Sequence, residues 1–120
     1  MSIFNFNSEI QNIFSGFSVN NTPIPVSLLR YEGHGEPYVT YMQYDMDASL
    51  SGDDSLIGCV VYYDFDIYSK SNYLDIIDAV VGKMQDNGWV WQVSRSSEDM
   101  FEDDTGYYHK TLCFAKESEV

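Results

Sequence analysis

The chain has 120 residues, of which 44% are hydrophobic and 16% aromatic, so we expect a single folded domain over residues 1–120 and not a disordered chain. Its 19 acidic and 6 basic residues give a formal net charge of −13, which argues against phosphate-clamping contact with nucleic acid and against docking on anionic membranes. Two kinds of partner fit this charge: a basic protein, or a protein whose phosphate site the chain occupies as a DNA mimic.

Residues 1–22 predict an N-terminal helix or an arm that packs on a neighbour. Ser8 and Gln11 have the spacing of a capping box, in which two side chains satisfy opposite backbone donors at a helix start. One helical stripe of apolar residues comprises Phe6, Ile10, Ile13, Phe14 and Phe17. We find no basic leader followed by a long apolar core and no apolar run long enough to span a membrane, so we expect a soluble, cytoplasmically made protein.

Two short strands follow, at residues 26–31 and 38–44, and the turn between them at 32–37 is rich in glycine and ends in proline. We expect the second strand to pair back on the first as a hairpin. Residues 45–56 are acidic and small and show no apolar periodicity, so they predict an exposed, mobile loop.

The best-defined pair of elements, a strand and then a helix that folds back across it, lies within residues 57–88. Alternation places one apolar face on the strand, made of Cys59, Val61, Tyr63, Phe65 and Ile67, opposite Tyr62, Asp64, Asp66 and Tyr68. From Tyr73 the apolar spacing becomes helical, at Leu74, Ile77, Val80, Val81 and Met84. Ser71 or Asn72 can cap this helix, and Gly88 can end it.

The last part of the chain predicts a strand at residues 89–94, a second acidic loop at 95–106, a strand at 107–115 and a polar tail at 116–120 that frays. The element order is therefore α-β-β-β-α-β-β. This order predicts an α+β fold, with a mainly antiparallel sheet and helices packed on one face.

No motif for catalysis, cofactor binding or metal binding is complete. Asp45, Asp47 and Ser49 match the first ligand positions of an EF-hand loop, but Leu50 and Leu56 stand where glycine and a bidentate glutamate are required. We therefore expect a non-enzymatic protein with no catalytic residues, no cofactor and no metal.

The remaining reactive residue types also favour structural roles. His34 lies in a glycine turn, and we expect His109 to be a hydrogen-bonding strand residue. Cys59 and Cys113 are expected to be reduced core residues, with a bridge between neighbouring strands as the alternative. The candidate interaction residues are the clustered acids and one tyrosine: Asp45, Asp47, Asp53, Asp54, Asp64, Asp66, Glu98, Asp99, Glu102, Asp103, Asp104 and Tyr107.

Three stretches, GDDSLIG, YYDFDIYSKSNYLDII and GWVWQVSRSSEDMFEDDTGYYHKTLCFA, and more loosely PYVTYM, carry a resemblance. The segment from Gly52 to Phe114 resembles small structural proteins of long-tailed phages and prophages of Gram-positive bacteria, of the tail-terminator or tail-completion type at the head–tail joint. The resemblance implies a ring, a hexamer, that caps the tail tube and contacts the tail-tube protein and the head–tail connector protein. It places the protein in the host cytoplasm during assembly and then in the virion, with loops 45–56 and 96–106 ordering on assembly.

Three alternatives stay open at this point. An acidic DNA-mimic inhibitor of a host nucleic-acid-binding protein fits the charge, although the main helix carries only Asp75, Asp78 and Asp86. A head-completion or minor tail protein has the same expected α+β core. A small hydrolase is the third alternative, and it lacks a recognisable set of catalytic residues.

Overall fold

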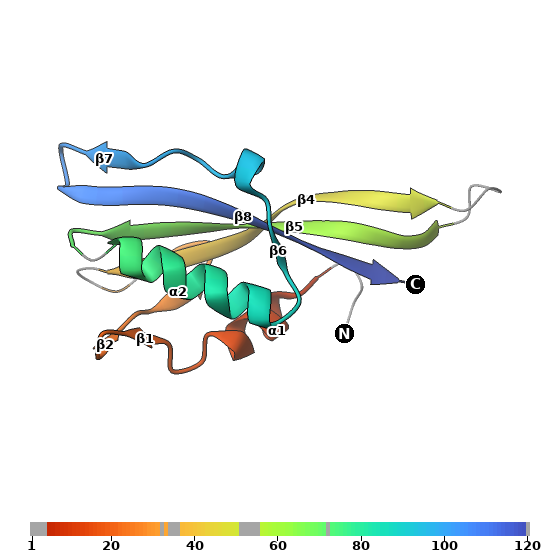
Figure 1. The fold of residues 1–120 in the computed structure, drawn as a ribbon, viewed down its shortest axis with the longest axis horizontal. Coiled ribbons are helices and arrows are strands. Elements are labelled where there is room, and N and C mark those ends of the chain that lie inside the picture. Colours follow the sequence, from red (N-terminus) through yellow and green to blue (C-terminus); the bar gives the residue numbers. More distant parts are fainter. Residues whose placement is uncertain (1–4, 32, 34–36, 51–55, 72, 120) are drawn as a thin grey trace.

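The computed structural model describes the chain except residues 1–4, 32, 34–36, 51–55, 72 and 120 (Figure 1). It confirms the α+β fold: two helices pack on one face of a six-stranded, mainly antiparallel sheet. The helices are α1 (Asn7–Ile13) and α2 (Tyr73–Asp86), with a 3-10 helix η1 (Val93–Arg95). The sheet has the order β3-β4-β5-β8-β6, with β7 also paired to β8. Its strands are β3 (Val26–Leu28), β4 (Tyr38–Leu50), β5 (Leu56–Ser69), β6 (Val90–Trp91), β7 (Met100–Glu102) and β8 (Tyr107–Glu119).

The core lies between the helices and the inner face of the sheet. The predicted alternation of β5 is confirmed, since its odd-numbered residues from Cys59 to Ile67 are buried. The core includes Ile10 from α1 and Phe14 at its C-cap, and Ile76, Val80 and Met84 from α2. Leu74 was expected in this buried stripe but is 60% exposed, and Ile76 takes its place against the sheet. The described residues include no helix that is both long and apolar enough to cross a membrane.

The expected hairpin between the first two strands is wrong. β3 pairs with β4 in parallel, with Val26 aligned to Val39, and it ends at Leu28 and not at residue 31. Because aligned residues share a face, the parallel register places Val26 and Val39 together in the core. A small separate hairpin, β1 (Ser18–Val19) with β2 (Thr22–Pro23), precedes β3 and was not expected.

The first predicted loop is largely strand, because β4 continues through Leu50 and β5 begins at Leu56. The register of the β4–β5 pair shifts between Gln43 and Asp45, and the pairing then continues with Asp45 opposite Tyr62. Backbone pairing along β5 thus extends the strand through residues whose composition suggested a loop. Residues 51–55, with Asp53 and Asp54, lie outside the described part of the chain.

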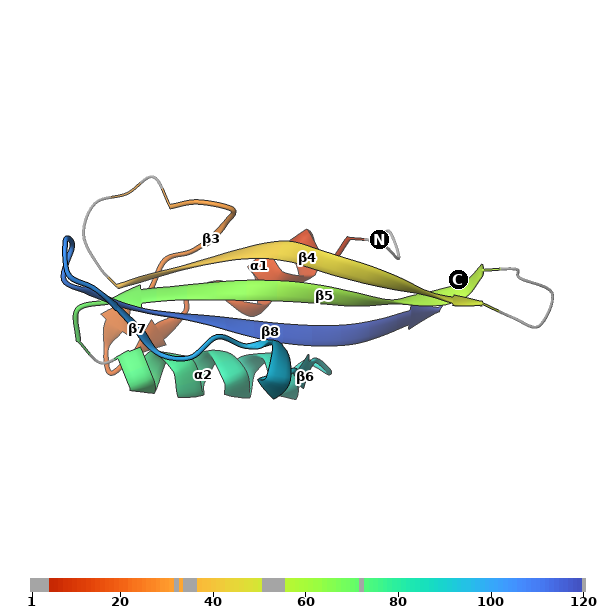
Figure 2. The ribbon, with the colours of Figure 1, turned by 90° about the horizontal axis from the view of Figure 1, so that it is seen from above.

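The C-terminal predictions need similar correction. β8 runs through Glu119 alongside β5, so residues 116–119 are strand and not a frayed tail. Within the predicted loop 95–106, residues 100–102 form β7, which pairs with β8. The predicted strand 89–94 is shorter, since η1 follows β6. The result is an elongated molecule of 52 × 27 × 24 Å, in which β4, β5 and β8 run side by side (Figure 2).

The ends of the helices are fixed differently from one another. The predicted capping box of α1 is wrong: the helix begins at Asn7, and Phe6, at the N-cap, makes no side-chain cap bond. Instead, the Tyr63 hydroxyl on β5 accepts a hydrogen bond from the Phe6 backbone N–H at 2.9 Å, so the tertiary structure supplies the cap. Gly88, with φ of +86°, follows the end of α2 as predicted. Asn72, a predicted cap for α2, lies outside the described residues.

Candidate interaction surfaces

The face of the sheet opposite the helices is open and carries several of the predicted interaction residues. Aligned residues of β4, β5 and β8 form rows across it, because paired residues in neighbouring strands point to the same side. Four of these rows are Tyr38–Tyr68–His109, Thr40–Asp66–Thr111, Met42–Asp64–Cys113 and Asp45–Tyr62–Ala115. The structure therefore brings Asp45 of β4 onto the same surface as Asp64 and Asp66 of β5.

Asp66 is tied into this face by β8. Its Oδ1 accepts a hydrogen bond from the Thr111 hydroxyl at 2.5 Å and lies 3.1 Å from His109 Nε2. Burial by itself would raise the pKa of Asp66, but the hydrogen bonds from His109 and Thr111 outweigh it and lower the pKa. His109 is thus a hydrogen-bonding strand residue, as expected, and Asp66 stabilises the sheet and is not a free surface carboxylate.

A row of stacked rings stands beside Asp66. The ring centroids of Tyr38 and Tyr68 are 4.8 Å apart, those of Tyr68 and His109 are 4.2 Å apart, and Tyr31 stacks on Tyr38 from the other side at 4.8 Å. Tyr107 packs edge-on against Tyr68, with the two ring centroids 6.3 Å apart. Burial, followed by the charge of Asp66, raises the pKa of Tyr68 to about 12. These rings rigidify one end of the open face.

The pKa of Asp64 is shifted in the opposite direction from that of Asp66, although the two residues are only two positions apart on the same strand. Its pKa is raised, chiefly by burial and then by the charge of Asp66, against the hydrogen bond that it shares with Cys113. Burial and the nearby Asp64 raise the pKa of the Cys113 thiol to about 12, so the thiol stays protonated at neutral pH. Cys113 and Cys59 are both buried and form no disulfide, as predicted, and the strand register aligns them with Asp64 and Ser118 and not with each other.

Arg95 reaches across to the open face from η1. Its guanidinium lies 4.0 Å from the ring centroid of Tyr62, and its Nη1 lies 3.7 Å from Asp45 Oδ2. An aromatic ring and a carboxylate together hold a planar cation, so this is a cation–π contact supported by an ion pair. Tyr62 and Arg95 are 33 positions apart in the sequence, so no local sequence signal could have found this contact.

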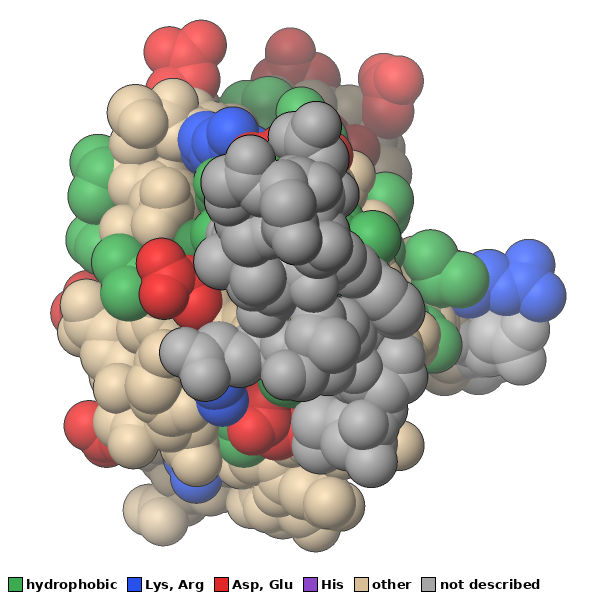
Figure 3. All heavy atoms as spheres, turned by 90° about the vertical axis from the view of Figure 1, so that its right-hand side faces the viewer, with side chains coloured by type: hydrophobic (Ala, Val, Ile, Leu, Met, Phe, Trp, Pro, Cys, Tyr) green, Lys and Arg blue, Asp and Glu red, His purple; other side chains and the backbone are tan. Residues whose placement is uncertain are grey.

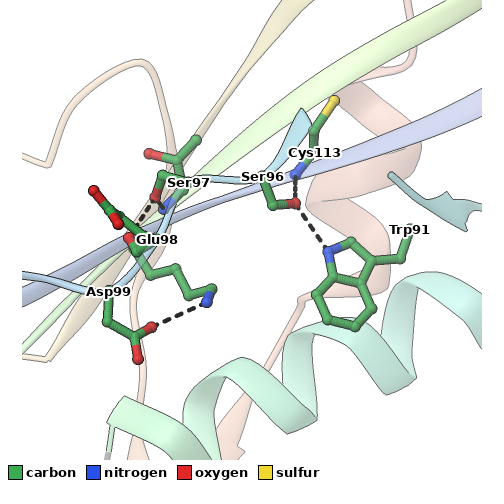
Figure 4. A network of polar contacts seen from close by, with 8 residues as sticks. Trp91, Ser96, Ser97, Glu98, Asp99 and Cys113 are labelled. Atoms are coloured by element: carbon green, nitrogen blue, oxygen red, sulfur yellow. Dashed lines mark hydrogen bonds and ion pairs between the residues drawn. The ribbon is translucent and has the colours of Figure 1, made fainter. Parts of the chain in front are cut away.

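The segment between β6 and β7 is joined to β8 by side chains (Figure 4). Ser96 Oγ accepts hydrogen bonds from Trp91 Nε1 at 3.0 Å and from the Cys113 backbone N–H at 3.1 Å. Asp99 accepts a hydrogen bond from Lys110 at 3.0 Å, which lowers the pKa of Asp99. The Ser96 hydroxyl thus accepts a hydrogen bond from a backbone N–H of β8 at a point where no regular strand pairs with β8.

Among the other predicted interaction residues, Glu102 is aligned with Tyr107, and its charge acts on Tyr38 and Tyr68 of the open face. The exposed acids of the β7 region are Glu98, Asp99, Glu102, Asp103 and Asp104. Asp45 and Asp47 are also exposed, and as strand residues of β4 they lie on the open face, opposite Tyr62 and Val60. His34, like Asp53 and Asp54, lies outside the described residues. In the part of the chain that is described, no three His, Cys, Asp or Glu side chains gather as a metal site.

Two opposite edges of the sheet expose apolar side chains. Beyond Tyr41, β4 has no outer neighbour among the described strands, and this stretch exposes Met42, Tyr44, Met46 and Leu50. The opposite edge, formed by β6, η1 and β7, exposes Val90, Val93, Met100 and Phe101. Seen from one end of the molecule, hydrophobic and acidic side chains lie next to each other around the residues that the structure does not describe (Figure 3). Exposed apolar residues along an unpaired strand edge are typical of association surfaces.

In comparisons with known proteins, no protein-family model and no curated protein matches the sequence.

Proposed function

We propose that this protein is a non-enzymatic structural subunit that assembles into a closed ring, as a tail terminator or tail-completion protein at the head–tail joint of a long-tailed phage. The observation that carries the proposal is the pair of apolar edges on opposite sides of one sheet. The β4 edge comprises Met42–Leu50, and the β6–β7 edge comprises Val90–Glu102. When an edge of one copy joins a different edge of the next, the contact is heterologous and leads to rings or filaments.

The two edges are suited to such contact in chemistry as well as in position. Tyr44 is 57% exposed on the β4 edge, and Val93 is 64% exposed on the β6–β7 edge. Burying large apolar side chains at an interface contributes about 25 cal/mol for each Å² removed from water. The β4 edge also offers backbone groups that a neighbouring chain can pair with.

The net charge of −13 supports the same proposal. A ring of such subunits presents carboxylates to DNA, and their repulsion of phosphates lets DNA pass without adhering. The charge also makes the subunits repel one another, so we expect assembly to strengthen as salt rises from about 50 mM to about 500 mM. The sequence resemblance supplies the expected hexamer and the expected partners, the tail-tube protein and the head–tail connector protein.

Light scattering coupled to size-exclusion chromatography tests the proposal on the full chain of 13.8 kDa, alone and with tail-tube protein. We expect a ring mass for the wild type and loss of the ring for Tyr44→Lys on one edge and Val93→Lys on the other. Leu74→Lys is the matched control, since Leu74 is equally exposed but lies on α2. It should assemble like the wild type.

Mixing the two edge variants sharpens the test. Tyr44→Lys keeps an intact β6–β7 edge and Val93→Lys keeps an intact β4 edge, so their mixture retains one productive contact. We expect the mixture to form a dimer of one copy of each variant and no ring. A wild type that stays monomeric with tail-tube protein at high salt would contradict the proposal, as would assembly that both edge variants leave intact.

A further inference from the structure

A shallow groove crosses the open face of the sheet beside β6. Its volume is about 540 Å³, and its main lining residues are Val60, Tyr62, Val90, Gln92, Ala115 and Glu117. The register aligns Tyr62 with Ala115 and Ala115 with Val90, so these side chains share the open face. Lys116 also borders the groove, but its ammonium group is bound to Glu9 and to the Asn87 carbonyl. The floor of the groove is therefore mostly apolar.

Carboxylates stand on both sides of this floor. Val60 is aligned with Asp47 on β4 and with Glu117 on β8, and both acids are exposed. In the next row, Asp45 lies beside Tyr62. An apolar floor between carboxylates complements a side chain that has a methylene stem and a cationic head, as arginine and lysine do.

The chain's own Arg95 already binds at the border of the groove in this way. Its guanidinium lies 4.0 Å from the Tyr62 ring centroid and 3.7 Å from the Asp45 carboxylate. Arginine suits such a position better than lysine, because its planar group stacks on an aromatic ring and bonds a carboxylate at the same time.

From this groove we propose a docking site for a basic, arginine-rich segment of another protein, bound in extended form across the open face. The acidic rim attracts the segment, and the floor formed by Val60, Tyr62 and Ala115 contacts its aliphatic stems. The site shares Asp47 with the β4 edge and Val90 with the β6–β7 edge, so this binding competes with ring contacts and is measured on chains that have not assembled. Its salt dependence has the opposite sign: added salt screens the attraction and weakens binding.

Fluorescence anisotropy of the full chain with a labelled peptide of alternating arginine and glycine tests the site. The double variant Asp47→Asn/Glu117→Gln should bind about fivefold more weakly, because two charge contacts of the rim are lost. The matched control Asp78→Asn/Asp86→Asn removes the same charge from exposed positions of α2. It should weaken binding less than about twofold.

Arg95 gives a second, independent readout. Arg95→Gln frees the Tyr62 ring and Asp45 and should tighten peptide binding, whereas Arg30→Gln makes the same charge change at an exposed position after β3 and should have a smaller effect. Backbone amide shifts in nuclear magnetic resonance should cluster at Val60, Tyr62 and Glu117. The proposal is overturned by absence of peptide binding at low salt, by equal effects of the two double variants, by equal effects of the two arginine variants, or by shifts confined to residues 98–104.

Discussion

Lys116, in the last strand, donates a hydrogen bond to Glu9 of the first helix, with 3.0 Å between Nζ and Oε1. The same ammonium group contacts the Asn87 carbonyl after α2 at 3.3 Å and lies over the rings of Phe6 and Trp89. One cation therefore joins α1, the end of α2 and β8 at the border of the core.

Replacing Lys116 with methionine should destabilise the protein by about 1–2 kcal/mol, because the half-buried Glu9 carboxylate is left without its partner. Urea unfolding followed by circular dichroism measures the change. Lys83→Met, on an exposed position of α2, is the control and should shift the midpoint little. Equal midpoints for the two variants would show that the Lys116 ion pair does not support the fold.

Asp66→Asn should lower stability at pH 7 by about 1–2 kcal/mol, because charged hydrogen bonds to His109 and Thr111 become weaker neutral ones. The folded-state pKa of Asp66 lies below the ordinary 3.8, so the ionised group stabilises the fold above that value. This contribution is lost as the pH falls below 3.8 and through the folded-state pKa. Urea midpoints at a series of pH values should therefore converge for wild type and variant in acid, and a constant gap down to about pH 2 would count against the assignment.

Asp64→Asn should have the opposite effect, although Asp64 is only two residues away on the same strand face. Burial raises the pKa of Asp64 above 3.8, so ionisation at neutral pH costs the folded protein stability. The variant should unfold at a higher urea concentration at pH 7, by less than about 1 kcal/mol, and lose this advantage below about pH 4. Destabilisation at pH 7 would mean that the hydrogen bond with Cys113 needs the charged carboxylate.

Replacing each of two glycines in the α2 region with alanine should change the stability of the protein in opposite directions. Gly88 has φ of +86°, where an L side chain is strained, so Gly88→Ala should cost about 1–2 kcal/mol. Gly82 lies within α2, and a Cβ there meets nothing within 4 Å, so Gly82→Ala should stabilise the protein by about 0.5–1 kcal/mol. Thermal unfolding of both variants checks the pair, and a destabilised Gly82→Ala would contradict it.

The candidate surfaces were only partly accessible to sequence reasoning. Alternation along β5 correctly placed Asp64 and Asp66 on the face away from the core, because that pattern depends on neighbouring residues alone. It could not show that the Asp66 carboxylate is bound by His109 and Thr111, whereas Asp64 shares a hydrogen bond with Cys113. The contact of Arg95 with Tyr62 was also missed, because it depends on tertiary packing: Arg95 reaches Tyr62 only when η1 packs beside β8.

The sequence by itself determined what strong local periodicity records: the burial of most apolar residues in and beside α1, the alternation of β5, most of the α2 face, the glycine after α2, and hence the α+β class. The tertiary structure decided the parallel pairing of β3 with β4, the extension of β4 and β8 through acidic residues, and the cap that Tyr63 supplies to α1. The physical reason is that periodicity records which side of an element faces the core, whereas pairing partners are chosen by backbone groups that every residue has in common.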